Sequence, residues 1–140
     1  MIETTPMRPL PAPDALTAPF WSAVRQHRFM LPSCKACGRT HFYPRSLCPH
    51  CSSADLEWIE VSGTGTVYSF TLVQRAPSPA FSGQVPYVVA IVELAEGPHL
   101  MTGITGCDPK DVAIGMAVEA DYLDIADATL PMFRPAGSAR

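Results

Sequence analysis

The sequence predicts a mainly β protein, made of an N-terminal helix, a small cysteine-rich ribbon and a closed five-stranded barrel. Two C-x-x-C pairs, separated by ten residues, predict the ribbon. Five short apolar or β-branched segments follow the ribbon, with one helical turn between the third and the fourth, and a small OB-fold barrel fits that pattern best. A β-sandwich would need about seven strands and a longer chain.

Three segments are expected along the chain. Residues 1–28 form a proline-rich arm and a docking helix, residues 29–58 a rubredoxin-like zinc ribbon, and residues 59–140 an OB-fold barrel with a C-terminal extension. Apolar residues make up 47% of the 140 residues and charged residues 16%, which is enough apolar material for a core. Ten of the 15 prolines lie in three stretches, residues 6–19, 77–86 and 131–135, which indicate connections or extended arms.

A short helix is expected at the end of the arm. Thr17 is its expected N-cap, Pro19 is tolerated in the first turn, and the helix runs to about His27. Phe20 and Trp21 fall on its apolar side. Two alternatives remain open for that side: it covers the rest of this chain, or it forms an exposed surface for a partner or ligand.

Four cysteines are predicted to hold a structural metal: Cys34, Cys37, Cys48 and Cys51. The segments 29–33 and 40–43 flank the first pair and are expected to form a β-hairpin with the pair at its tip. Four thiolates at about 2.3 Å satisfy tetrahedral zinc, and two such pairs are rarely a redox centre. Zinc is the commoner structural metal, while iron in a rubredoxin-like site stays open. Because the protein fills all four positions, Lewis-acid catalysis is not expected.

The rest of the chain is expected to form the barrel. A long irregular loop, residues 74–86, separates the first strand from the second, and Asp108 with Pro109 predicts an N-cap and a helical turn. The expected strands cover residues 66–73, 87–94, 99–105, 118–123 and 130–133.

No set of catalytic residues is recognisable in the sequence. Cys107 is a lone thiol without a neighbouring histidine, and Asp108 and Asp111 would raise its pKa. The acidic residues after 118, including Glu119 and Asp121, are expected on a solvated strand face. No membrane-spanning or secretory segment is visible, so a cytoplasmic protein is expected.

Charge is distributed unevenly and bears on the class of ligand. Residues 1–58 carry six basic and four acidic side chains, and residues 59–140 carry four basic and nine acidic ones. Zinc ribbons and OB-folds often bind nucleic acid, so a nucleic-acid-binding module is the alternative function. The acidic barrel disfavours that alternative, because nucleic-acid binding needs a basic face.

The order of short motifs resembles a known family. The aromatic helix and the ribbon are followed by Gly63-Thr64-Gly65-Thr66-Val67-Tyr68-Ser69, Val85-Pro86-Tyr87-Val88-Val89, Ile114-Gly115-Met116-Ala117-Val118 and Phe133-Arg134-Pro135. This order is similar to that of the OB-fold/zinc-ribbon proteins catalogued as domain-of-unknown-function family thirty-five, over about residues 17–135. One departure is Ser52 after the second cysteine pair, where glycine is more usual.

The resemblance implies a non-catalytic accessory subunit with a structural zinc. Such a subunit binds, or helps bind, acyl-CoA and docks onto a thiolase-superfamily enzyme or a MaoC-like (hot-dog) enoyl-CoA hydratase. If a coenzyme A thioester is bound, its phosphates need cations. The candidates for that role are Arg28, Arg39, Arg45 and Arg75. An equally open alternative is that Arg45 offsets the thiolate charge or is simply solvated.

The apolar arms at the two ends of the chain are the expected partner contacts. Their candidate residues are Phe20, Trp21, Met132 and Phe133.

Overall fold

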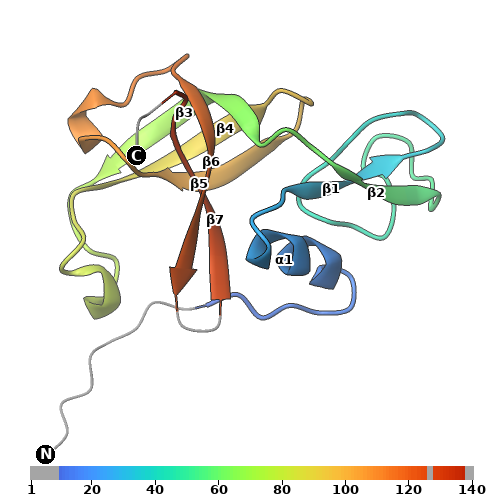
Figure 1. Ribbon diagram of the computed structural model, residues 1–140, viewed down its shortest axis with the longest axis horizontal. Coiled ribbons are helices and arrows are strands. Elements are labelled where there is room, and N and C mark those ends of the chain that lie inside the picture. Colours follow the sequence, from blue (N-terminus) through green and yellow to red (C-terminus); the bar gives the residue numbers. More distant parts are fainter. Residues whose placement is uncertain (1–9, 126–127, 138–140) are drawn as a thin grey trace, which may run out of the picture.

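The computed structural model describes residues 10–125 and 128–137, and it has the expected mainly β architecture. Residues 1–9 of the arm and 138–140 of the C-terminal extension lie outside the described residues. The helix is α1 (Ala18–Arg25), and the strands are β1 (Met30–Cys34), β2 (Leu56–Glu60), β3 (Thr64–Val73), β4 (Tyr87–Leu94), β5 (His99–Ile104), β6 (Ala117–Ile125) and β7 (Ala128–Pro135). Figure 1 shows β1 and β2 beside the barrel, with α1 packed against β1 and β7.

Helix α1 begins where the sequence predicts and ends two residues before the expected position. Thr17 stands at the N-cap position, but its side chain does not cap the helix. Its hydroxyl and its backbone N–H instead donate to the Asp14 carboxylate, at 3.0 and 2.9 Å. The helix ends at Arg25, because His27 adopts the left-handed conformation with a φ of 59°. The His27 ring stacks on Tyr122 of β6 and so connects the end of the helix to the barrel.

The ribbon strand β1 pairs with β2, from Met30 opposite Glu60 to Cys34 opposite Leu56. The expected hairpin between residues 29–33 and 40–43 is present only in reduced form, as one isolated antiparallel bridge between Ser33 and Thr40 and a hydrogen bond from the His41 N–H to the Pro32 carbonyl at 3.2 Å. Cys34 is the last residue of β1, and the other three cysteines lie in the long connection between β1 and β2, so the returning strand comes after the second pair. The expected boundary at residues 58 and 59 falls inside β2.

The remaining five strands form a closed barrel in the order β3-β4-β5-β7-β6. Neighbouring strands are antiparallel except β5 and β7, which run parallel where Ile104 lies opposite Phe133. Alternate residues of β4 point inward, and Val88, Ala90 and Val92 are almost completely buried. The expected turn before β6 is a 3-10 helix, η2 (Pro109–Asp111), and the Asp108 side chain accepts from the Lys110 N–H as predicted.

One core joins the helix, the ribbon and the barrel. Phe20 of α1 packs edge-on against Phe29, and Phe29 lies 6.0 Å, ring centre to ring centre, from Phe133 of β7. Phe20 and Phe133 are both 0% exposed. Their prediction as surface contacts for a partner is therefore wrong, because this chain already buries them. Trp21 and Met132 are half-buried.

Among the described residues, no helix is long and apolar enough to cross a membrane.

Candidate metal centre and neighbouring surfaces

The two cysteine knuckles repeat the same backbone geometry. The Gly38 N–H donates to the Cys34 carbonyl at 2.8 Å, and the Ser52 N–H donates to the Cys48 carbonyl at the same distance. The N–H of the first cysteine of each pair also donates to the carbonyl five residues further on, at 2.9 and 2.8 Å. Each knuckle therefore turns both of its sulfur atoms toward one point.

The four sulfur atoms fit a tetrahedral metal. All four lie within 4.8 Å of one another. The Cys34 and Cys51 sulfurs are 3.5 Å apart, and those of Cys37 and Cys48 are 3.7 Å apart. Tetrahedral zinc with bonds of about 2.3 Å requires sulfur–sulfur distances of about 3.8 Å. The predicted ligand set is thus assembled with the spacing that zinc needs.

Electrostatics also favour a cation among these sulfurs. The Cys37 backbone N–H lies 3.4 Å from the Cys34 sulfur and is the main cause that lowers the pKa of Cys34 to about 7. For Cys51, the Ser53 backbone N–H lowers the pKa, but the Cys34 sulfur, burial and the other two cysteines together raise it to about 12. Four adjacent thiols cannot all ionise unless a cation compensates their charge. A bound zinc ion would supply that charge and hold the two knuckles together.

Ser52 occupies a position that suits glycine, since its φ is 67° and that of Gly38 in the matching position is 79°. We expect Ser52→Gly to stabilise the zinc-loaded protein by about 1 kcal/mol, because a side chain costs energy in the left-handed region. Thermal unfolding should then show a rise in Tm of about 3 °C.

The matched control for Ser52→Gly is Ala54→Gly, two residues further on, where φ is negative. We expect this control to lower Tm, because glycine there gives only additional freedom to the unfolded chain. Equal shifts in the two variants would contradict the assignment of strain to Ser52.

The structure separates the four arginines that were predicted to contact phosphate. Arg28 forms an exposed ion pair with Glu60 at 2.9 Å. Arg75 follows β3 in the chain and does not line the cleft beside the ribbon. Arg39 and Arg45 both line that cleft, which has a volume of about 610 Å³ and lies between the ribbon and the turn from β4 to β5.

Cys107 has the properties of an unreactive thiol. It is half-buried and packs against the core of the barrel. Burial raises its pKa, and Asp111 and Asp108 raise it further, in the direction predicted from the sequence.

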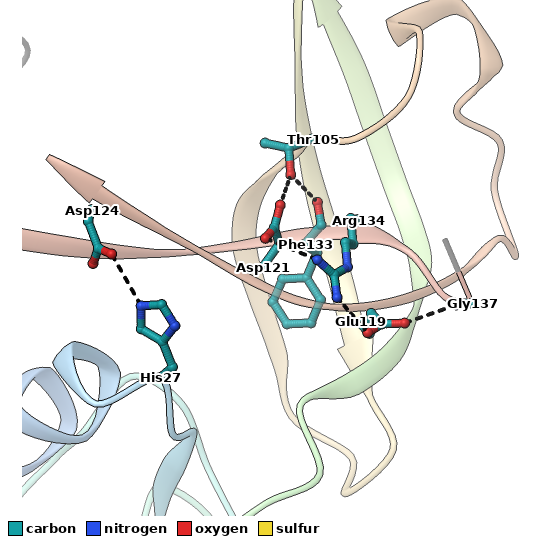
Figure 2. Close-up of polar contacts among 8 residues, drawn as sticks. All are labelled: His27, Thr105, Glu119, Asp121, Asp124, Phe133, Arg134 and Gly137. Carbon is teal, nitrogen blue, oxygen red and sulfur yellow. Dashed lines mark hydrogen bonds and ion pairs between the residues drawn. The ribbon is translucent and has the colours of Figure 1, made fainter. Parts of the chain in front are cut away.

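The acidic residues of β6 are bound rather than solvated (Figure 2). Arg134 of β7 contacts Glu119 at 3.2 Å and Asp121 at 3.4 Å, and the Thr105 hydroxyl donates to Asp121 at 2.7 Å. Glu119 and Asp121 share one strand face as expected, but that face is only partly solvated, with side chains 32% and 21% exposed, because Arg134 lies directly opposite Glu119 in the strand register. This network connects three parts of the barrel wall and gives these carboxylates a structural role.

The outer face of the barrel carries an apolar strip, of which the sequence analysis named Met132 alone. Its side chains surround a hollow of about 390 Å³ and include Val89, Met101, Leu123 and Met132. Met101 is 68% exposed. The end of the Met132 side chain lies over Gly103, in the space that a Cβ atom would fill. Period-two alternation along β4 and β5 could have indicated this face, since outward positions there are apolar instead of polar.

A four-cysteine ribbon joined to a closed barrel with this strand order defines a zinc-ribbon/OB-fold protein. The family model for the ChsH2 rubredoxin-like zinc ribbon domain matches residues 21–57, and the model for the ChsH2 C-terminal OB-fold domain matches residues 58–123. The chain belongs to the ChsH2/DUF35 family of zinc-ribbon/OB-fold proteins, which confirms the resemblance seen in the sequence.

Two relatives indicate what kinds of protein the family includes. The chain is 43% identical over 131 residues to a probable enoyl-CoA hydratase alpha subunit of Thermomonospora curvata, covering 93% of this chain and 40% of the relative. It therefore spans well under half the length of that subunit. It is 38% identical over 116 residues to a DUF35 domain-containing scaffold protein of Methanocaldococcus jannaschii, covering 81% of this chain and 82% of the relative.

Two solved structures share the fold. A chain of the structure described as Ltp2-ChsH2(DUF35) aldolase superposes with a TM-score of 0.80 at 42% identity, covering 90% of this chain and 98% of that one. A DUF35 protein of Sulfolobus solfataricus gives a TM-score of 0.62 at 20% identity, with 86% and 85% coverage, and supports the fold alone.

Proposed function

We propose that the chain is a non-catalytic accessory subunit that docks onto a MaoC-like (hot-dog) enoyl-CoA hydratase or a thiolase-superfamily enzyme and helps that enzyme bind acyl-CoA. The apolar strip on the outer face of the barrel carries this proposal. The names of the relatives support it, since one is a hydratase subunit, others are scaffold proteins, and the similar solved chain comes from an aldolase complex.

The strip has the chemistry of a protein contact. The outer face of a small antiparallel barrel normally carries polar side chains toward water. Here Val89, Met101 and Met132 come from three neighbouring strands and present apolar atoms around one hollow. Contiguous apolar surface of this kind marks interaction sites, and methionine side chains adapt to the shape of a partner.

The described residues also lack a nucleophile poised beside a base. Cys107 has a raised pKa, and Glu119 and Asp121 are bound to Arg134. His27 contacts Asp124 and His99 contacts Glu93, but both pairs are exposed. The Thr129 hydroxyl joins the first pair, but it donates to Asp124 at 2.6 Å and not to the histidine that would act as its base. Chemistry is therefore assigned to the partner enzyme.

Co-purification tests the proposal directly. The tagged full chain, isolated from its own cells, should bring down a hydratase-like or thiolase-like chain in a fixed ratio. Met101→Asp and Met132→Asp should each lower the recovery of that chain at least about tenfold, since a charge buried in a contact is costly.

The matched control is Ile114→Asp, because Ile114 is 69% exposed and lies outside the strip. We expect it to recover the partner as the wild type does. Recovery of RNA with salt-sensitive affinity, in place of an enzyme subunit, would favour the nucleic-acid alternative. If both methionine variants recover the partner as the wild type does, the docking surface is not the apolar strip.

A further inference from the structure

The cleft between the ribbon and the β4–β5 turn gathers nitrogen-bearing side chains from both halves of the chain. The ribbon contributes Arg39, Arg45 and His50, and the barrel contributes His99 at the start of β5. His99 is far from the other three in the sequence, and the packing of the ribbon beside the barrel brings it to them. The cleft thus combines two permanent cations with imidazole groups, which is the chemistry of an anion site.

His41 gives independent evidence that a ligand belongs in this cleft. It lines the same cleft, yet its side chain is buried and the residue is 3% exposed. Neither ring nitrogen of His41 has a hydrogen-bond partner among the described residues. Buried polar atoms in folded proteins nearly always have a partner, so two unpartnered nitrogens at the wall of a cleft indicate a missing polar group.

Arg39 and Arg45 can both donate hydrogen bonds to a polar ligand in the cleft, but their surroundings differ. The Arg39 Nη1 atom lies 3.3 Å from His50 Nδ1, a contact that fixes the position of one arm of its guanidinium. Within the described part of the chain, Arg45 forms no hydrogen bond and no ion pair. Neither guanidinium donates to a cysteine sulfur, so the N–H groups of both arginines are not taken up by the metal ligands.

Glu96 is the acidic residue that lines the cleft. Its Oε2 accepts from the Ser62 backbone N–H at 2.9 Å, which ties this carboxylate to the chain between β2 and β3. His99 is similarly engaged, because it contacts Glu93 at 3.2 Å and packs against Tyr68. Two guanidinium groups therefore face one engaged carboxylate, and the cleft retains a positive excess.

We propose that this cleft binds the phosphate groups of coenzyme A, with Arg39 and Arg45 as the cationic clamp and His41 as a buried hydrogen-bond partner. This inference rests on the proposed function, which supplies coenzyme A as the source of the phosphate. Guanidinium groups bind phosphate oxygens in bidentate fashion. A volume of about 610 Å³ exceeds that of one phosphate ion, and Phe42, Pro49 and Pro98 give the cleft apolar walls for the rest of a nucleotide.

Calorimetric titration of the zinc-loaded full chain tests the site. Coenzyme A and 3′-phosphoadenosine 5′-phosphate should bind, and pantetheine, which lacks phosphate, should not. Arg39→Gln and Arg45→Gln should each weaken binding by about tenfold or more, since each removes a charged hydrogen-bond donor. Arg75→Gln, which removes a cation outside the cleft, should bind as the wild type does. The ring nitrogen resonances of His41 should shift on addition of coenzyme A.

The possible outcomes separate the sources of phosphate. Equal affinity for coenzyme A and pantetheine, or wild-type affinity in both cleft variants, would overturn the proposal. Inorganic phosphate binding as tightly as coenzyme A would keep an anion site but overturn the assignment of coenzyme A. Unchanged zinc content and circular dichroism show that a variant is folded. Failure here would leave partner recovery through the apolar strip unaffected, so the two proposals can fail separately.

Discussion

Replacing Cys48 by serine should remove the metal and the folded ribbon together. Cys48 is buried, and its backbone N–H and carbonyl both close the second knuckle. The ribbon has one pair of five-residue strands, and an isolated two-stranded unit is at best marginally stable. Metal binding therefore supplies folding free energy to this segment, as it does in other small zinc domains. Zinc should fall from one ion per chain to nearly none, with a parallel loss of soluble protein, when metal content and soluble yield are measured.

Cys107→Ser is the matched control for the loss of a thiol. Cys107 lies outside the four-cysteine cluster, so this variant should keep its metal and its solubility. A Cys48→Ser protein that stays soluble, folded and metal-free would refute a structural metal. Elemental analysis of the wild type also distinguishes zinc from iron, the alternative that cysteine spacing leaves open.

Local patterns were sufficient to predict most elements. The β-branched run in β4 predicts its limits, residues 87–94, to the residue, since no proline or glycine interrupts it. The four cysteines come from two knuckles, and their spacing alone predicts the cluster. Such patterns can be recognised in the sequence because neighbouring residues determine the backbone conformation of a strand or a knuckle.

Features that depend on residues far apart in the sequence were not predicted, or were predicted incorrectly. Nothing near β1 in the sequence shows that it pairs with a strand more than twenty residues away. Arg134 binds Glu119 and Asp121 because β6 and β7 are in register, which no local pattern reveals. The cleft beside the ribbon is also non-local, because its walls come from residues 38–50 and 96–99.

The aromatic residues at the two ends of the chain also show that a local pattern does not identify what packs against it. An apolar helix face predicts that something covers it, but it does not say whether the cover is this chain or another protein. Phe20 and Phe133 meet the shared core, so their burial already stabilises the folded chain. The candidate partner surface moves to the opposite, outward side of β7, where Met132 lies next in sequence to Phe133.

Phe133→Ala should strongly destabilise the protein. The ring is 0% exposed, lies 6.0 Å from the Phe29 ring and fills the junction of barrel and ribbon. Removing a buried phenylalanine costs about 3–5 kcal/mol, through lost transfer energy and the cavity left behind. That loss is a large part of the typical total stability of about 5–15 kcal/mol for a small domain. Urea unfolding of the zinc-loaded variant should show a free energy of unfolding that is lower by this amount. The midpoint concentration falls accordingly, while the slope m is unchanged.

Met132→Ala is the matched control, because Met132 adjoins Phe133 but points to the outside of the barrel, where it is half-buried. We expect it to cost about 1 kcal/mol, well below the cost of truncating a fully buried side chain. The two variants also separate stability from docking. If Phe133→Ala unfolds at the wild-type urea concentration yet fails to recover a partner, Phe133 is a contact residue and its position in the core is refuted. The backbone of β7 is held independently of that ring, since the Phe133 carbonyl accepts from the Thr105 N–H at 2.7 Å, so the truncation tests the side chain itself.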